Sequence, residues 1–252
     1  MMQRSFRFSI LLAALFAVAA MDPPSQPITL SPEQAIKEGR ALVDEMLSDQ
    51  PEKNSVSGTM AIRRGKTYRE IPIKFETTLS PTNWISDYAA VYKDHVDHFL
   101  ICHTPNQTNT YSQFSSALDG GNVRPRELVK NFWAPFADSD FSIADLGLEF
   151  LHWPGQKLLQ KEMKLGRSCL VLESTNPHPE TGGYAKVKCW IDDESHGILL
   201  AQAFDSKGKQ IKDFAPGDFS KSKATGQWQL GKMRISDSRT GSTTTIRFDV
   251  DK

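Results

Sequence analysis

The sequence has few of the features that mark membrane-spanning, nucleotide-binding or nucleic-acid-binding proteins. After residue 20, no apolar stretch of this 252-residue chain approaches the roughly 20 residues of a membrane-spanning helix. Neither a glycine-rich phosphate loop nor a dinucleotide-binding motif occurs. The 30 basic and 30 acidic residues are mixed along the chain, which leaves no basic patch for nucleic acid. No internal repeat or low-complexity linker divides the chain, so a single domain is expected.

Cysteine is also scarce, with three residues in all. Because no Cys-x-x-Cys pair occurs, redox catalysis is not indicated. Residues 167–174 and 184–191 flank a turn-rich loop and predict an antiparallel hairpin, in which a loop centred near Pro179 puts Cys169 opposite Cys189. We therefore predict a Cys169–Cys189 disulfide that leaves Cys102 unpaired. The alternative is that the two cysteines stay reduced in the core.

Residues 1–20 have the features of a secretory signal peptide. Arg4 and Arg7 precede an apolar run, Phe8–Ala20, whose 13 residues are too few for a membrane-spanning helix. Small residues predict cleavage near Ala19 or Ala20. Loss of the two arginines leaves 28 of the 30 basic residues against 30 acidic ones. Residues 21–252 are expected to form one exported, soluble domain.

The mature chain predicts one amphipathic helix followed by many strands. A capping sequence with proline at the first helical position, Ser31–Gln34, begins a helix that is predicted to end at Ser48. From Val56 apolar and polar residues alternate, which is the period of a strand with one buried face. Further strands are predicted at residues 83–92, 96–103, 157–175, 184–191, 198–205, 225–236 and 242–250. The chain is therefore predicted to be mainly β (α+β), with an antiparallel sheet of roughly ten strands that tends to curl.

An acidic and aromatic stretch, residues 134–146, separates the two halves of the predicted sheet. Within it, Ser142 and Asp145 have the spacing of a capping box, so a short helix is predicted to begin there and to run toward Phe150. Asp138 and Asp140 offer a carboxylate pair for acid–base chemistry. We favour a role in turns or capping, because the sequence indicates no substrate pocket around them.

Two other groups contain side chains that catalytic or metal sites use. His95 and His98, with Cys102 four residues on, have the ligand types of a zinc site, but on an extended strand the two imidazoles point to opposite faces. Ser195 and His196, next to an acidic run, have only the composition of a hydrolytic triad, since adjacent side chains diverge. We therefore expect no enzyme, no metal and no other cofactor.

Four segments carry a resemblance to a known family. They are Phe132–Leu146 with Asp-Phe-Ser-x-x-Asp-Leu, Leu165–Glu173 with Gly-Arg-x-Cys-x-x-Leu-Glu, Cys189–Asp192 with Trp-Ile-Asp, and Ala203–Lys209. In this order and spacing they resemble the outer-membrane lipoprotein-sorting protein family, which has the LolA-like fold. The resemblance implies an incomplete antiparallel β-barrel, with an N-terminal helix and a short mid-chain helix that covers the concave face. It also implies an apolar hollow that receives acyl chains in the periplasm.

The resemblance implies a carrier that binds the acyl chains of a lipoprotein or lipid for transfer toward the outer membrane. Its partners would be that cargo, an inner-membrane transporter and an outer-membrane acceptor. One departure is Ser80-Pro81, where known carriers have an arginine–proline step whose arginine helps to latch the lid. The alternative function is a non-catalytic binding or sensor module of an envelope protein complex. Apolar strand residues are the candidates for lining the hollow, and each is equally compatible with an ordinary packed core: Met60, Ile62, Ile73, Phe75, Phe99, Ile101, Val171, Val187 and Ile191.

Overall fold

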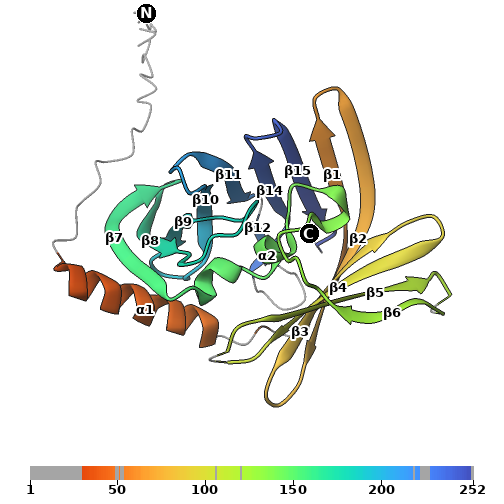
Figure 1. Ribbon diagram of the computed structural model, residues 1–252, viewed down its shortest axis with the longest axis horizontal. Helices are drawn as coiled ribbons and strands as arrows, with labels where there is room; N and C mark the ends of the chain where they lie inside the picture. Colours follow the sequence, from red (N-terminus) through yellow and green to blue (C-terminus); the bar gives the residue numbers. More distant parts are fainter. Residues whose placement is uncertain are drawn as a thin grey trace, which may run out of the picture.

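One curved antiparallel sheet of 13 strands forms the body of the molecule (Figure 1). The computed structural model describes residues 30–48, 51, 54–105, 107–119, 121–217, 219–221 and 228–250. The predicted signal peptide, residues 1–20, lies outside the described residues. The sheet confirms the predicted fold class, an incomplete antiparallel barrel, and contains more strands than the sequence indicated.

Two series of hairpins build the two halves of the sheet. The first half contains β1 (Asn54–Arg64), β2 (Thr67–Leu79), β3 (Trp84–Val91), β4 (His95–His103), β5 (Thr110–Ala117) and β6 (Asn122–Leu128). The second half contains β7 (Gly155–Lys164), β8 (Arg167–Thr175), β9 (Lys186–Asp192), β10 (Ile198–Phe204), β11 (Gln210–Pro216), β14 (Lys232–Asp237) and β15 (Ser242–Phe248). Strands β1 and β15 pair and so join the halves. A separate two-stranded sheet, β12 (Phe219–Lys221) and β13 (Trp228–Leu230), lies between β11 and β14 in the chain.

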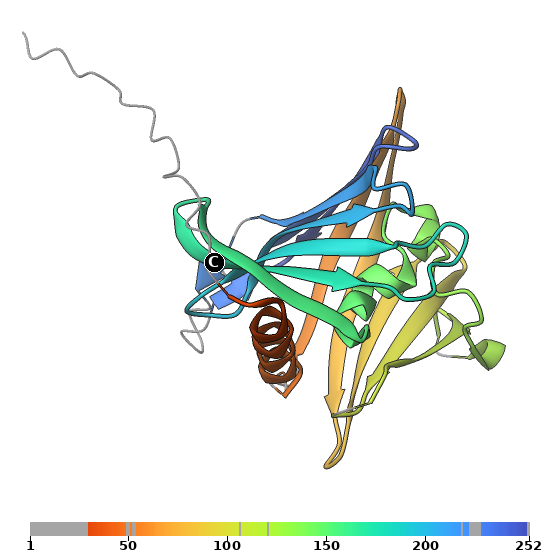
Figure 2. The same ribbon diagram turned by 60° about the vertical axis from the view of Figure 1, so that its left-hand side comes forward.

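The connection between β6 and β7 has an unusual position. These strands are consecutive in the chain but lie at the two opposite edges of the sheet. The connection, residues 129–154 and called the lid below, therefore has to bridge the open side of the barrel, and Figure 2 shows it lying between the two wings of the sheet. It contains the 3-10 helix η1 (Phe136–Asp138), the helix α2 (Ile143–Leu146) and the 3-10 helix η2 (Glu149–His152).

The predicted mid-chain helix is confirmed at its start and is shorter than expected. Ser142 and Asp145 form the capping box: the Asp145 amide donates to Ser142 Oγ, and the Ser142 amide donates to the Asp145 carboxylate. Helix α2 ends at Leu146 because Leu148 adopts a left-handed conformation (φ 48°), which an α-helix does not contain. The chain then resumes as η2.

The N-terminal helix, α1 (Pro32–Ser48), is confirmed together with its cap. Ser31 Oγ accepts from the Gln34 amide, and the Gln34 side chain accepts from the Ser31 amide. The helix packs on edge strand β7 so closely that a Cβ on Gly39 would lie 2.8 Å from the Leu158 amide nitrogen. Among the described residues, no helix is both long and apolar enough to span a bilayer.

The predicted Cys169–Cys189 disulfide is wrong, and all three cysteines are free thiols. The hairpin itself is confirmed, but its register pairs Cys169 with Asp192 and Cys189 with Leu172. Because successive side chains of a strand alternate between its faces, this register sends the two thiols to opposite sides of the sheet. Cys189 packs in the interior with Leu172, and Cys169 packs in a separate cluster with Val171 and Trp190.

Candidate functional site

The concave face of the first half of the sheet gathers most of the predicted hollow-lining residues. Four of them are buried in one cluster with lid residues Phe136 and Phe141: Met60, Ile62, Ile73 and Ile101. Phe99 packs at the edge of this cluster, with its ring 5.2 Å from that of Phe136. Phe75 is half-buried and contacts Tyr88, which also packs against the cluster. These six side chains therefore share one apolar surface beneath the lid.

The second half of the sheet brings together two more of the predicted residues and separates the third. Val187 and Ile191 lie in a cluster that includes Leu42 and Val43 of α1 and lid residues such as Phe150. Val171 belongs to the cluster of Cys169 and Trp190, on the opposite face of β8 from Leu172. Val171 therefore does not face the hollow with the others.

In the described part of the chain, side chains of the sheet and the lid pack against each other in the hollow. A cavity between them has a volume of about 30 Å³, which is space for one or two water molecules. Its wall is apolar apart from Asp145, Tyr184 and Lys212. In this conformation the lid occupies the space in which a ligand of the concave face would lie.

Asp140 anchors the lid to β15. Its carboxylate is buried and accepts hydrogen bonds from Thr244 Oγ1 (2.7 Å) and from Ser242 Oγ, and its amide donates to Thr244 Oγ1 (2.9 Å). A buried carboxylate is stable only when donors surround it, and here the two hydroxyls supply them. Asp140 is therefore held by β15 through both its side chain and its backbone amide.

A second anchor is the buried ion pair between Lys212 of β11 and Asp145 of α2. Lys212 Nζ lies 3.0 Å from Asp145 Oδ2 and donates to the Asp140 carbonyl oxygen at 2.7 Å. The hydroxyl of Tyr184 donates to Asp145 Oδ1 at 2.6 Å. Burial raises the pKa of Tyr184, and the Asp145 charge adds to this, so the phenol stays a donor. Asp145 thus has two roles, as helix cap and as anchor.

Further polar contacts lie toward the two ends of the lid. Arg69 of β2 donates to the Ala137 carbonyl oxygen at 2.9 Å and lies 3.5 Å from the exposed Asp138 carboxylate. At the other end, the Tyr111 hydroxyl donates to Glu149 at 2.5 Å. Burial raises the pKa of Glu149, while the hydrogen bond from Tyr111 lowers it. The exposed Arg69–Asp138 pair contributes little. The polar part of the attachment therefore rests mainly on Asp140, Asp145 and Lys212, beside the apolar contacts of the lid with the sheet.

These anchors were not predicted from the sequence, apart from the capping role of Asp145. Lys212, Ser242 and Thr244 stand on strands where charged and hydroxyl residues are common. They are far from residues 140 and 145 in the chain and form no sequence motif with them, so the contacts could not be recognised from the sequence. The departure at Ser80-Pro81, where the resemblance places the latch of known carriers, stays a prediction. Both residues are exposed after the end of β2, and Lys212 holds the lid from a different strand.

The other groups singled out in the sequence are held in local hydrogen bonds. His98 Nδ1 lies 2.9 Å from Asp87 Oδ2 and His98 Nε2 lies 3.2 Å from Ser116 Oγ, while His95 Nδ1 pairs with Asp94. Neither His95 nor His98 lines the small cavity beside Asp145, Tyr184 and Lys212. Across the described ranges, no three His, Cys, Asp or Glu side chains are grouped as metal ligands would be.

Comparison with solved structures identifies the fold. A DUF1329 family protein from Desulfovibrio piger is 19% identical, with a TM-score of 0.65 over 85% of this chain and 91% of that one. A putative outer membrane lipoprotein-sorting protein domain from Vibrio parahaemolyticus is 16% identical, with a TM-score of 0.66 over 85% and 91%. A LolA superfamily protein from Nitrosomonas europaea is 12% identical, with a TM-score of 0.53 over 86% and 94%. The chain therefore has the LolA-like fold that the sequence motifs suggested.

Comparison of the sequence with other proteins and with family models identifies the family of the chain. No curated protein sequence matches the chain. A family model with the description "Uncharacterized protein" matches residues 94–250, which include the lid and all of the second half of the sheet. The chain belongs to that family, and its own fold is LolA-like.

Proposed function

We propose that the protein is a non-catalytic periplasmic carrier that binds the acyl chains of a lipoprotein or lipid against its concave face and delivers them toward the outer membrane. The observation that carries this proposal is the lid. An apolar sheet face is covered by one connection, and a few buried polar contacts at Asp140 and Asp145 hold that connection in place. The LolA-like fold supports the same function.

The lid provides a physical means for acyl chains to be taken up and released. Acyl chains gain free energy wherever apolar surface replaces water, and the concave face offers such surface once Phe136 and Phe141 withdraw. Withdrawal leaves the sheet intact, because the lid joins two strands that do not pair with each other. Cargo and lid would then compete for the same residues, which allows both uptake and release.

The experiment is native mass spectrometry of the mature protein isolated gently from its own periplasm, followed by extraction of any bound molecule. Phe75→Asp places a charge on the concave face. Its matched control is Phe114→Asp, which changes another half-buried phenylalanine, on β5 and stacked on His98. A stoichiometric acyl adduct in the wild type and in Phe114→Asp, but not in Phe75→Asp, supports the carrier.

A second function is favoured by one observation, the small residual cavity of about 30 Å³. A hollow filled by its own side chains suits a binding or sensor module of an envelope complex, in which the exterior of the domain does the binding. The binding or sensor module would be supported, and the carrier contradicted, by a protein that has the mass of the ligand-free chain, takes up no added lipid or lipopeptide and co-purifies stably with another protein.

A further inference from the structure

The hairpin of β1 and β2 ends in a basic segment, residues 63–69, which is called the tip below. Figure 2 shows this end of the hairpin extending beyond the neighbouring strands of the sheet. Every residue of the tip is exposed, on both faces of the hairpin. The tip is therefore a two-stranded projection whose side chains are available to a partner from outside the chain.

Positive charge is concentrated in the tip, which contains Arg63, Arg64, Lys66 and Arg69. Arg64 and Arg69 donate to backbone carbonyl oxygens of the lid, at 3.4 and 2.9 Å. Arg63 and Lys66 form no ion pair with any residue of the described ranges. At least two cations are thus free to pair with an external anion.

The excess of positive charge is local to this hairpin. Two carboxylates lie near the tip: Asp138 is 3.5 Å from Arg69, and Glu70 accepts a hydrogen bond from the Tyr68 hydroxyl. The four cations therefore exceed the nearby carboxylates by two. In the whole chain, by contrast, 30 basic residues balance 30 acidic ones. A negatively charged surface would attract the tip without attracting the molecule as a whole.

An exposed aromatic ring lies among these cations. Tyr68 is 54% exposed, and the guanidinium of Arg63 lies 5.8 Å from the centre of its ring. Tyrosine side chains favour the level of the lipid headgroups, because the ring is apolar and the hydroxyl is polar. Long basic side chains at the same level reach the phosphates. The composition of the tip therefore suits the surface of a bilayer.

The shape of the tip favours a bilayer over a protein as its partner. A stable protein–protein interface buries about 800 Å² on each partner, whereas this projection consists of two short strands and a turn. A fluid headgroup layer surrounds whatever enters it, so a narrow projection gains contacts on both of its faces.

We propose that the tip of the β1–β2 hairpin docks the protein on the surface of an anionic phospholipid bilayer. Arg63 and Lys66 pair with lipid phosphates, and the ring of Tyr68 lies at the headgroup level. Each basic side chain near such a surface strengthens binding about fivefold. Because Arg64 and Arg69 connect the tip to the lid, docking places the start of the lid near the bilayer. A role of this contact in delivery rests on the proposed function, but the contact itself does not.

The test is sedimentation of the full mature protein with vesicles of equal parts phosphatidylcholine and phosphatidylglycerol, and with vesicles of phosphatidylcholine alone. We expect binding to the anionic vesicles only, and its loss when salt is raised from about 50 mM to about 500 mM. Arg63→Gln/Lys66→Gln should bind about 25-fold more weakly. The matched control is Lys37→Gln/Lys157→Gln, which removes the same charge from exposed residues of α1 and β7 and should bind like the wild type.

Two results of this assay overturn the proposal. The first is that the wild type does not sediment with anionic vesicles, in which case an acidic protein is the class of partner left for the tip. The second is an equal loss of binding in the two double variants, since binding would then follow the total charge of the protein and not the tip.

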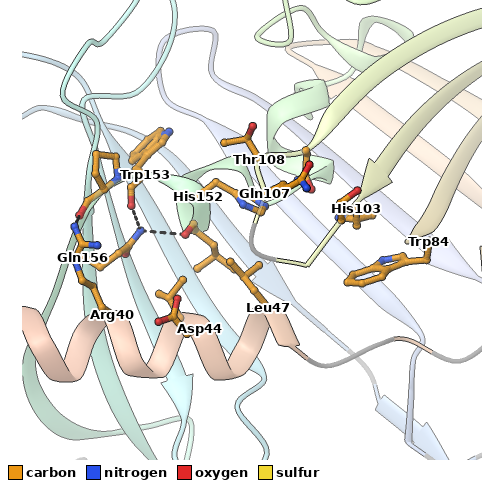
Figure 3. Close-up of a pocket in the computed structure, with 15 residues that line it drawn as sticks. Arg40, Asp44, Leu47, Trp84, His103, Gln107, Thr108, His152, Trp153 and Gln156 are labelled. Atoms are coloured by element: carbon orange, nitrogen blue, oxygen red, sulfur yellow. Dashed lines mark hydrogen bonds between the residues drawn. The ribbon is translucent and has the colours of Figure 1, made fainter. Parts of the chain in front are cut away.

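The orientation of the bound protein gives a second readout. Strand β2 runs from the tip to Leu79, about 40 Å away along the strand, and Trp84 pairs with Leu79 at this far end. Figure 3 shows Trp84 there, beside a cavity of about 370 Å³ that α1 also lines. With a paramagnetic label on the lipid headgroups, the amide NMR signals of Lys66 and Tyr68 should broaden more than the indole signal of Trp84. Equal or greater broadening of Trp84 contradicts docking through the tip.

Docking and acyl binding are separable in these experiments, because sedimentation is scored whether or not the protein carries an acyl chain. Vesicle binding through the tip without an acyl adduct supports this inference and contradicts the carrier. An acyl adduct in a protein that does not bind anionic vesicles supports the carrier and overturns this inference.

Discussion

Replacing Lys212 tests whether a buried ion pair fastens the lid. Lys212→Met keeps the length of the side chain but leaves the Asp145 carboxylate buried without its counter-charge, and the Asp140 carbonyl oxygen loses a donor. Removing one member of a buried pair usually costs about 3–5 kcal/mol. Tyr184 and the Ser142 amide still donate to Asp145, so we expect the lower end, a loss of about 3 kcal/mol in the free energy of unfolding.

The measurement is urea unfolding followed by circular dichroism, together with hydrogen exchange of lid amides such as that of Asp140, which donates to Thr244. Lys186→Met is the matched control, because Lys186 forms a partly exposed pair with Glu173 (3.2 Å), and surface pairs are usually worth less than about 1 kcal/mol. The double variant Lys212→Met/Asp145→Asn should lose less than the sum of its single changes. A loss below about 1 kcal/mol in Lys212→Met, with unchanged exchange at Asp140, would refute the reasoning.

Three other perturbations test separate features. Gly39→Ala places a Cβ 2.8 Å from the backbone of β7, so differential scanning calorimetry should show a lower Tm and a loss of about 1–3 kcal/mol, whereas an unchanged Tm would show that α1 is not packed as described. The pKa of His103 is about 4 in the folded protein, so this side chain binds fewer protons in the folded than in the unfolded state. Its contribution to the free energy of unfolding, up to about 3 kcal/mol, is therefore present above pH 6.5 and is lost as the pH falls toward 4. Unfolding measured at several pH values should show a shallower acid dependence in His103→Gln, and identical dependences would contradict the assignment. Intact mass of the protein purified without reductant should equal that of three free thiols; the loss of two hydrogens would restore a disulfide.

Sequence periodicity predicted the elements whose two faces differ strongly. Helix α1 with its Ser31 cap and the β1–β2 hairpin have regular apolar positions, so their buried faces were evident. Strands β5 and β11 were missed because hydroxyl, amide and charged residues occupy much of them. In β11, the inward position 212 is a lysine. A lysine predicts an exposed position, and only its pairing with Asp145 explains why this one is buried.

The prediction of a disulfide was wrong for a related reason. The sequence shows a turn-rich loop but not the number of residues that the loop uses, and the loop fixes the register of the strands around it. Cys169 was placed opposite Cys189, whereas Leu172 occupies that position. The observed register also explains why Val171 does not line the hollow as predicted, because Val171 lies on the same face of the sheet as Cys169.

The energetic balance of the lid indicates which cargo suits the proposed carrier. Opening the lid exposes Phe136, Phe141, Ile143 and Leu146, at about 2 kcal/mol each. It also separates Lys212 from Asp145, but both charges then enter water, so this separation costs little. A single acyl chain with about 14 methylenes gains about 11 kcal/mol on leaving water. The cost of exposing these side chains, about 8 kcal/mol in all, takes up most of the gain from one chain. Because a second chain adds its gain without a second opening, the closed lid would select cargo with two or more acyl chains over single-chain amphiphiles.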